Sequence, residues 1–205
     1  VPVGSDQTIR QRGIWQDVYL RGRPEVCVSD VTIRTSTRRE ELTVILELTN
    51  ASDRSRTVRP ELSVRECGGL VALTFAHEPV TLAPGGRETV ELTRTWSSYL
   101  PWSPESPNLY FLGTRLTEDG AAVDAREDRF GFREVWVEGH RVMLNGRPVH
   151  MSGEWCHKHN LDNFRPEYVR QWYGMLKDLH MNYIRTHTFP HPKVVLDLAD
   201  EMGIL

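Results

Sequence analysis

The fold is decided by the stretch that covers residues 182–205, which reads NYIRTHTFPHPKVVLDLADEMGIL. Its first six residues alternate between two faces, with Tyr183 and Arg185 on one face and Ile184 on the other, as a strand requires. A loop rich in histidine and proline follows. Apolar residues then recur at helical spacing until Gly203, which is a typical helix stop, and an apolar pair resumes the strand pattern. The stretch predicts a strand, a loop, a helix and the start of another strand.

The preceding segment has the same form. Residues 147–153 are a short strand candidate, and Pro166 stands where a helix would start, with Asp162 and Asn163 as candidate caps. An apolar stripe at helical spacing, as in a core-facing helix, is formed by Val169, Trp172, Leu176 and Leu179. Strands that alternate with helices indicate a parallel sheet. Two and a half such units cannot close a sheet, and the chain starts at Val1 without a methionine, so we expect a fragment.

Residues 25–132 have a different pattern, that of an antiparallel β-sandwich. Leu42–Thr49 alternates most clearly, and Thr57–Arg65 and Thr89–Arg94 alternate similarly between turn-forming segments. The runs Leu109–Glu118 and Ala121–Phe132 predict a closing hairpin. The predicted fold class is therefore mainly β, with a sandwich followed by an unfinished parallel sheet.

Composition excludes several classes of partner. The 205 residues are 39% hydrophobic and 26% charged, with a formal net charge of -3, as in an ordinary globular protein. Basic residues are scattered, so we expect no nucleic acid partner. No apolar run approaches the roughly 18 residues that cross a bilayer, so we expect no membrane partner. Of the three cysteines, Cys27 and Cys67 fit either a disulfide or two buried free thiols, which leaves the compartment open.

Four motifs occur in the order that glycoside hydrolase family 2 shows, the group of β-galactosidases, β-glucuronidases and β-mannosidases. The chain resembles this family at GIWQDVYL (residues 13–20), WSPESPNLY (102–110), FGFREV with LNGRPV (130–135 and 144–149), and a passage from Lys177 through Asn182 and Ile184–His187 to Leu198–Leu205. The resemblance implies that residues 1–20 close a jelly-roll sugar-binding-like domain and that residues 21–133 form an immunoglobulin-like sandwich. Residues 134–205 would then start a (β/α)8 barrel.

The family resemblance also implies an activity, retaining hydrolysis of a β-glycoside of the β-galactosidase kind. One glutamate is the acid/base and another is the nucleophile. Both belong to later barrel strands, beyond Leu205, so no catalytic residue is assigned and the isolated chain is predicted to be inactive. The implied partner is a β-linked oligosaccharide or glycoside, with no cofactor, and a second copy of the chain is a candidate to cover apolar faces. The alternative is a non-catalytic sandwich used for binding or spacing.

Barrel sites lie at the C-terminal ends of the strands, which directs attention to residues 154–159 and 185–191. Arg185 matches the family arginine beside the nucleophile, where a fixed cation keeps a carboxylate ionised. The alternative is a structural bridge to another carboxylate. Glu154 would accept hydrogen bonds from sugar hydroxyls or pair with Arg185, and we favour the ion pair.

The remaining candidates are aromatic or imidazole side chains of the same two loops. His157 falls where a family histidine approaches the sugar hydroxyls, and either His187 or His191 would be a second sugar-facing histidine. Trp155 fits a stacking platform for a sugar ring, or a core residue of the kind that we expect at Trp172.

A metal site is the competing interpretation of these loops. Zinc-compatible residue types are Cys156, His157, His159, His187 and His191. The run Cys-His-Lys-His lacks the usual ligand spacing, however, and the family resemblance already accounts for part of the cluster. We therefore predict no metal.

Overall fold

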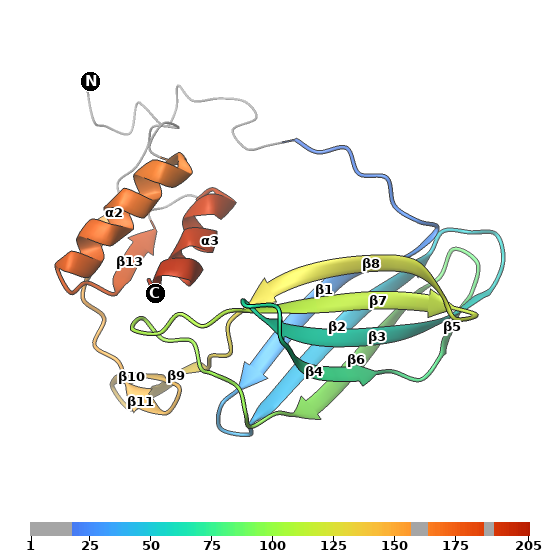
Figure 1. Ribbon diagram of the computed structural model, residues 1–205, viewed down its shortest axis with the longest axis horizontal. Coiled ribbons are helices and arrows are strands. Elements are labelled where there is room, and N and C mark those ends of the chain that lie inside the picture. The colour runs from blue at the N-terminus through green and yellow to red at the C-terminus, as the bar shows by residue number, and fades with distance from the viewer. Residues whose placement is uncertain (1–17, 157–163, 187–190) are drawn as a thin grey trace. The chain divides into compact units, whose positions relative to one another are not determined.

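The computed structural model describes residues 18–156, 164–186 and 191–205, and the chain divides into two compact units. The larger unit comprises residues 22–103 and 108–149, and the smaller unit includes residues 104–107 and 150–205. Strands dominate the described residues, and the helices α2 (Pro166–Asp178) and α3 (Lys193–Met202) belong to the smaller unit (Figure 1). The prediction of a mainly β fold is confirmed.

The larger unit is built around two antiparallel sheets, which form two layers in Figure 1. One sheet has the order β1-β2-β6, and the other has the order β4-β3-β7-β8, with β5 paired to β3. The strands are β1 (Val26–Ser36), β2 (Glu41–Asn50), β3 (Arg56–Glu66), β4 (Val71–Ala76), β5 (Val80–Leu82), β6 (Arg87–Thr95), β7 (Tyr110–Glu118) and β8 (Ala121–Phe130).

A single apolar core lies between these layers. Every second residue of β2 is fully buried, namely Leu42, Val44, Leu46 and Leu48, each 0% exposed. Leu62 of β3 and Leu112 of β7 contribute to the same core from the other sheet. Burying one such side chain stabilises the fold by about 1.5–3 kcal/mol. The strand predicted from the alternation of residues 42–49 is confirmed.

The predicted closing hairpin is also confirmed. Strands β7 and β8 pair antiparallel, and Asp119 and Gly120 join them with φ angles of 50° and 83°. Two successive positive φ angles are what a two-residue hairpin turn of type I′ requires, and Asp-Gly is a preferred pair for it.

The strand predicted at residues 147–153 is wrong. Asn145 and Gly146, with φ angles of 51° and 82°, turn the chain back, so that Arg147–Pro148 forms β11 beside β10 (Arg141–Leu144). Strand β10 also pairs with β9 (Val135–Glu138). The first parallel strand starts later, as β12 (Gly153–Cys156). The Asn-Gly pair therefore makes a hairpin turn, so that Arg147 and Pro148 pair back onto β10 rather than start the parallel sheet.

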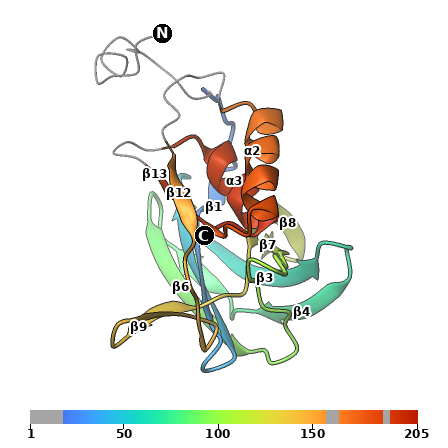
Figure 2. The ribbon, with the colours of Figure 1, turned by 90° about the vertical axis from the view of Figure 1, so that its left-hand side faces the viewer.

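The smaller unit has the predicted alternation of strand and helix. Strand β12 pairs in parallel with β13 (Tyr183–Thr186), and Figure 2 shows the two strands side by side with α2 and α3 next to them. Helix α2 starts at Pro166 as predicted, and α3 ends at Gly203 with a left-handed φ of 71°.

Two details of α2 differ from the prediction. Leu179 follows the last turn and is 65% exposed, whereas Tyr173 is fully buried beside Val169, Trp172 and Leu176. The N-cap is Arg165, without a side-chain cap, and the predicted caps Asp162 and Asn163 lie outside the described residues.

The last described residues start a third parallel strand, as predicted. The Leu205 amide donates to the Asn182 carbonyl at 2.8 Å, and the Ile184 amide donates to the Leu205 carbonyl at 2.9 Å. This is the slanted pattern of a parallel pair, on the side of β13 away from β12. The strands in the described part of the chain form no closed barrel.

Both described cysteine side chains are free thiols. Cys27 is buried and Cys67 is exposed, so the disulfide alternative is wrong, and only Cys27 fits the expectation of a buried thiol. Neither helix that the structure describes is long and apolar enough to cross a bilayer.

Candidate active-site face

The candidate site lies on the parallel strands β12 and β13. Of the residues predicted to form it, Glu154, Trp155, Arg185 and His191 have described side chains. His157 and His187 lie outside the described residues, and their sugar-facing roles stay predictions.

The register of the two strands decides which side chains share a face. Trp155 pairs with Arg185, and Glu154 pairs with Ile184. Ile184 is 7% exposed and packs in one cluster with Trp172 of α2 and Leu198 of α3, so its face of the strand pair is covered by the helices. Because successive residues of a strand point to opposite faces, Trp155 and Arg185 lie on the face away from the helices.

Glu154 points toward helix α2. Its Oε1 accepts a hydrogen bond of 2.6 Å from Nε1 of Trp172. No ion pair joins Glu154 to Arg185 within the part of the chain that the structure describes, so the favoured pairing is wrong. The physical reason is the register, which puts the two charged side chains on opposite faces of the strand pair.

Trp155 and Arg185 contact one another through a cation–π interaction. The Arg185 guanidinium carbon lies 5.4 Å from the centroid of the Trp155 ring, and Trp155 is 39% exposed. Arg185 is exposed, and among the described residues no carboxylate oxygen lies within 4.0 Å of its nitrogens. A cation in this arrangement is open to a carboxylate or to an anionic group that the described residues do not supply.

His191 is buried at the start of α3. It is 7% exposed, and its ring meets that of Phe164 edge to face, with centroids 5.7 Å apart. Aromatic packing of this kind fixes the ring before Pro192, the N-cap of α3. Its predicted contact with a sugar stays a prediction.

The described residues contain no group of three side chains that suits a metal ion. Among the zinc-compatible residues named from the sequence, only His191 has a described side chain. The side chains of the other zinc-compatible residues are not described, so the absence of a metal site at these two loops stays a prediction.

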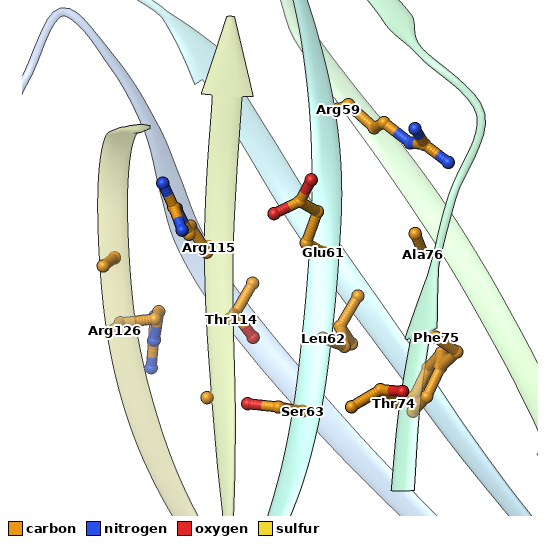
Figure 3. Close-up of a pocket in the computed structure, with 12 residues that line it drawn as sticks. Arg59, Glu61, Leu62, Ser63, Thr74, Phe75, Ala76, Thr114, Arg115 and Arg126 are labelled. Atoms are coloured by element: carbon orange, nitrogen blue, oxygen red, sulfur yellow. The ribbon is translucent and has the colours of Figure 1, made fainter. Parts of the chain in front are cut away.

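A hollow of about 610 Å³ lies on the sheet of the larger unit, over β4, β3, β7 and β8 (Figure 3). Gly113 lines the hollow, and a Cβ at this position would lie 3.0 Å from Ser63 Oγ. Arg59, Arg115 and Glu61 contribute charge, and Glu61 is the single carboxylate of the lining.

A sequence model of glycosyl hydrolases family 2 matches residues 26–133, more than half of the chain. The chain belongs to glycosyl hydrolases family 2. The β-galactosidase of Arthrobacter sp. (strain B7) is 30% identical over 203 residues, which cover 93% of this chain and 17% of that protein. The chain spans about one fifth of the length of the curated family 2 relatives that it matches.

Solved structures of family 2 have the same fold. A member from Bacteroides cellulosilyticus DSM 14838 has a TM-score of 0.79 at 20% identity, over 89% of this chain and 26% of that chain. The β-galacturonidase from Eisenbergiella tayi, solved with bound galacturonate, has a TM-score of 0.73 at 25% identity, over 89% and 32%. The membership predicted from the four motifs is confirmed.

Two of the family 2 motifs meet at Trp102, which is fully buried. Its amide donates to the Phe132 carbonyl at 2.9 Å, and the Arg133 guanidinium lies 4.3 Å from its ring. A Cβ on Gly131 would approach Trp102 Cβ to 3.0 Å, so the glycine permits this close packing. Asn145 donates to the Trp102 carbonyl at 2.8 Å and accepts from the Glu134 amide at 2.9 Å.

Glu134 adds a charged clamp to the same region. Its carboxylate accepts hydrogen bonds from Arg38 Nε at 2.8 Å and from Ser36 Oγ at 3.1 Å. Burial acts to raise the pKa of Glu134, but the hydrogen bonds from Arg38 and Ser36 and the charge of Arg38 outweigh it and lower the pKa to about 2. The clamp ties the β1–β2 hairpin to the segment that follows β8.

The family 2 passage of the smaller unit contains residues whose structural roles the sequence did not reveal. Asn182 accepts from the Ser152 amide at 3.0 Å and donates to the His150 carbonyl at 3.0 Å, which fixes the entry to β12. Gly153 tolerates no side chain, because a Cβ would lie 1.7 Å from the Tyr183 carbonyl oxygen. The position of Asn182 in the family motif was the one feature of the sequence that pointed to a role for this residue.

The loop 104–107 packs against the helices of the smaller unit. Lys177 donates a hydrogen bond to the Pro104 carbonyl, and a Cβ on Gly203 would come within 2.2 Å of the same oxygen. Within the smaller unit, the Pro104 carbonyl therefore contacts the C-terminal passage of the chain.

Proposed function

We propose that the chain is part of a retaining β-glycoside hydrolase of the β-galactosidase kind. The observation that carries the proposal is the pairing of Trp155 with Arg185 near the C-terminal ends of two parallel strands, on the face that the helices leave open, in a chain of family 2. In barrel enzymes this end of the strands bears the site. We assign residues 1–20 to a jelly-roll domain, 21–133 to an immunoglobulin-like domain and 134–205 to the start of a (β/α)8 barrel.

The chemistry would use two carboxylates about 5 Å apart, one as acid/base and one as nucleophile. Both are supplied by a longer polypeptide that contains this chain. Arg185 is the supporting group: its guanidinium pairs with the nucleophilic carboxylate, lowers the pKa of that carboxylate and orients it. Among the described residues no carboxylate oxygen lies within 4.0 Å of the Arg185 nitrogens, which is compatible with this role.

The substrate is a β-linked oligosaccharide or glycoside. The β-galactosidases among the relatives favour a galactoside as the substrate. The relative solved with bound galacturonate favours a sugar of similar shape. His157 and either His187 or His191 are proposed to hydrogen-bond the sugar hydroxyls, for which an imidazole can be donor or acceptor.

The test compares the full-length polypeptide with its Arg185→Ala variant on an aryl β-D-galactoside. We expect turnover by the full-length protein, a loss of about a hundredfold or more in kcat/KM for Arg185→Ala, and partial recovery in Arg185→Lys. Arg170→Ala is the matched control, because Arg170 is more than half exposed and pairs with Glu201 on the helix surface. The 205-residue chain alone should be inactive.

Full-length protein that hydrolyses no aryl β-glycoside would contradict the proposal and favour a non-catalytic module. Equal activity of Arg185→Ala and wild type would contradict the role of Arg185.

A further inference from the structure

We infer that Trp155 is a positioning residue that holds Arg185 in place for catalysis. The inference rests on the proposed function of Arg185 and adds a residue to it. The sequence left Trp155 between a sugar platform and a core residue, and the structure places its ring against the arginine instead.

The geometry fixes the pair from the backbone. Trp155 and Arg185 are register partners in adjacent parallel strands, so their side chains leave the same face next to each other. The guanidinium lies over the indole at 5.4 Å from the ring centroid. At 39% exposure Trp155 is too open to be an ordinary core residue.

Arg185 needs such a partner. It has a long flexible side chain, and no carboxylate oxygen of the described residues lies within 4.0 Å of its nitrogens. Glu154, the nearest acidic residue along β12, is held on the opposite face by Trp172. The Trp155 ring is therefore the described contact that limits where the guanidinium points, and tryptophan is the best aromatic partner for a cation.

Positioning and stacking predict different kinetics. A sugar platform binds substrate in the ground state, so its loss raises KM, whereas a misplaced Arg185 weakens support of the nucleophile and lowers kcat. Because a small displacement of a catalytic group can lower rate strongly, we expect a kcat effect of about tenfold when the ring is lost.

The test uses Trp155→Leu and Trp155→Phe in the full-length polypeptide, alone and combined with Arg185→Ala. We expect Trp155→Leu to lower kcat about tenfold with KM within about twofold, and Trp155→Phe to retain most activity because its ring preserves the cation–π contact. In the Arg185→Ala background, Trp155→Leu should not lower kcat any further, because the two side chains act as one unit.

A second measurement on the 205-residue chain is independent of turnover. The Arg185 Nε–H proton should show a ring-current shift in NMR spectra that persists in Trp155→Phe and disappears in Trp155→Leu. Three results would overturn the inference. They are additive losses of kcat for Trp155→Leu and Arg185→Ala, an effect of Trp155→Leu on KM alone, and an Arg185 resonance that is unchanged in Trp155→Leu. Loss of activity in Arg185→Ala with no effect of Trp155→Leu would overturn the inference and leave the proposed function intact. Unchanged activity in Arg185→Ala would overturn both the inference and the role proposed for Arg185.

Discussion

Replacing Glu134 with glutamine removes the charge from the clamp that joins β1 and β2 to the segment after β8. The pKa of Glu134 is lowered from 4.5 to about 2, which at 1.36 kcal/mol per pKa unit corresponds to about 3 kcal/mol in favour of the ionised folded form. Its partner Arg38 is 57% exposed, so solvent screening reduces the contribution. We expect Glu134→Gln to lower the free energy of unfolding by about 1–2 kcal/mol at pH 7.

The pH dependence follows from the direction of the shift. A carboxyl with a lowered pKa in the folded state contributes its full stability above its unfolded pKa of about 4.5 and loses it as the pH falls toward 2. The stability difference between wild type and Glu134→Gln should therefore shrink between pH 4.5 and pH 2.

Urea unfolding followed by tryptophan fluorescence at several pH values measures this difference. Glu127→Gln is the matched control, since its ion pair with Arg65 is exposed on both sides and should contribute less than 1 kcal/mol. A Glu134→Gln effect no larger than that of the control, or one that stays the same at pH 7 and pH 2, would refute the reasoning.

Two further substitutions test the packing of the family motifs. Gly131→Ala should lower the free energy of unfolding by about 1–3 kcal/mol, because its Cβ would lie 3.0 Å from Trp102, and calorimetry checks this against Gly68→Ala, whose Cβ would meet nothing within 4 Å. Asn182→Ala should speed amide exchange at Ser152, which loses its acceptor, while leaving exchange in β2 unchanged. Unchanged exchange at Ser152 would mean that Asn182 does not hold the entry to β12.

Regular alternation made much of the fold predictable. Leu42 to Leu48 mark β2 because every second residue enters the core, and Pro166 and Gly203 mark helix ends through their backbone preferences. The strand predicted over residues 147–153 starts too early, because the positive φ angles of Asn145 and Gly146 fold Arg147 and Pro148 back onto β10 and β12 starts only at Gly153. A local turn decided the outcome there.

The site was harder to predict because it depends on register. The sequence placed Glu154, Trp155 and Arg185 at two strand ends, but only the pairing of Trp155 with Arg185 assigns them to faces. In this register Glu154 faces helix α2 and hydrogen-bonds Trp172, whereas Arg185 lies beside the indole ring of Trp155. The residue type alone carries no such information.

The central claim is that this chain supports a retaining β-glycoside hydrolase through Arg185. It is tested most directly by proton NMR of the first product that the full-length polypeptide releases from an aryl β-D-galactoside, with wild-type Arg185 and with Arg185→Ala. The account predicts a product of retained β configuration and a loss of about a hundredfold or more in rate for the variant. An inverted product, or equal rates for the two proteins, would contradict it.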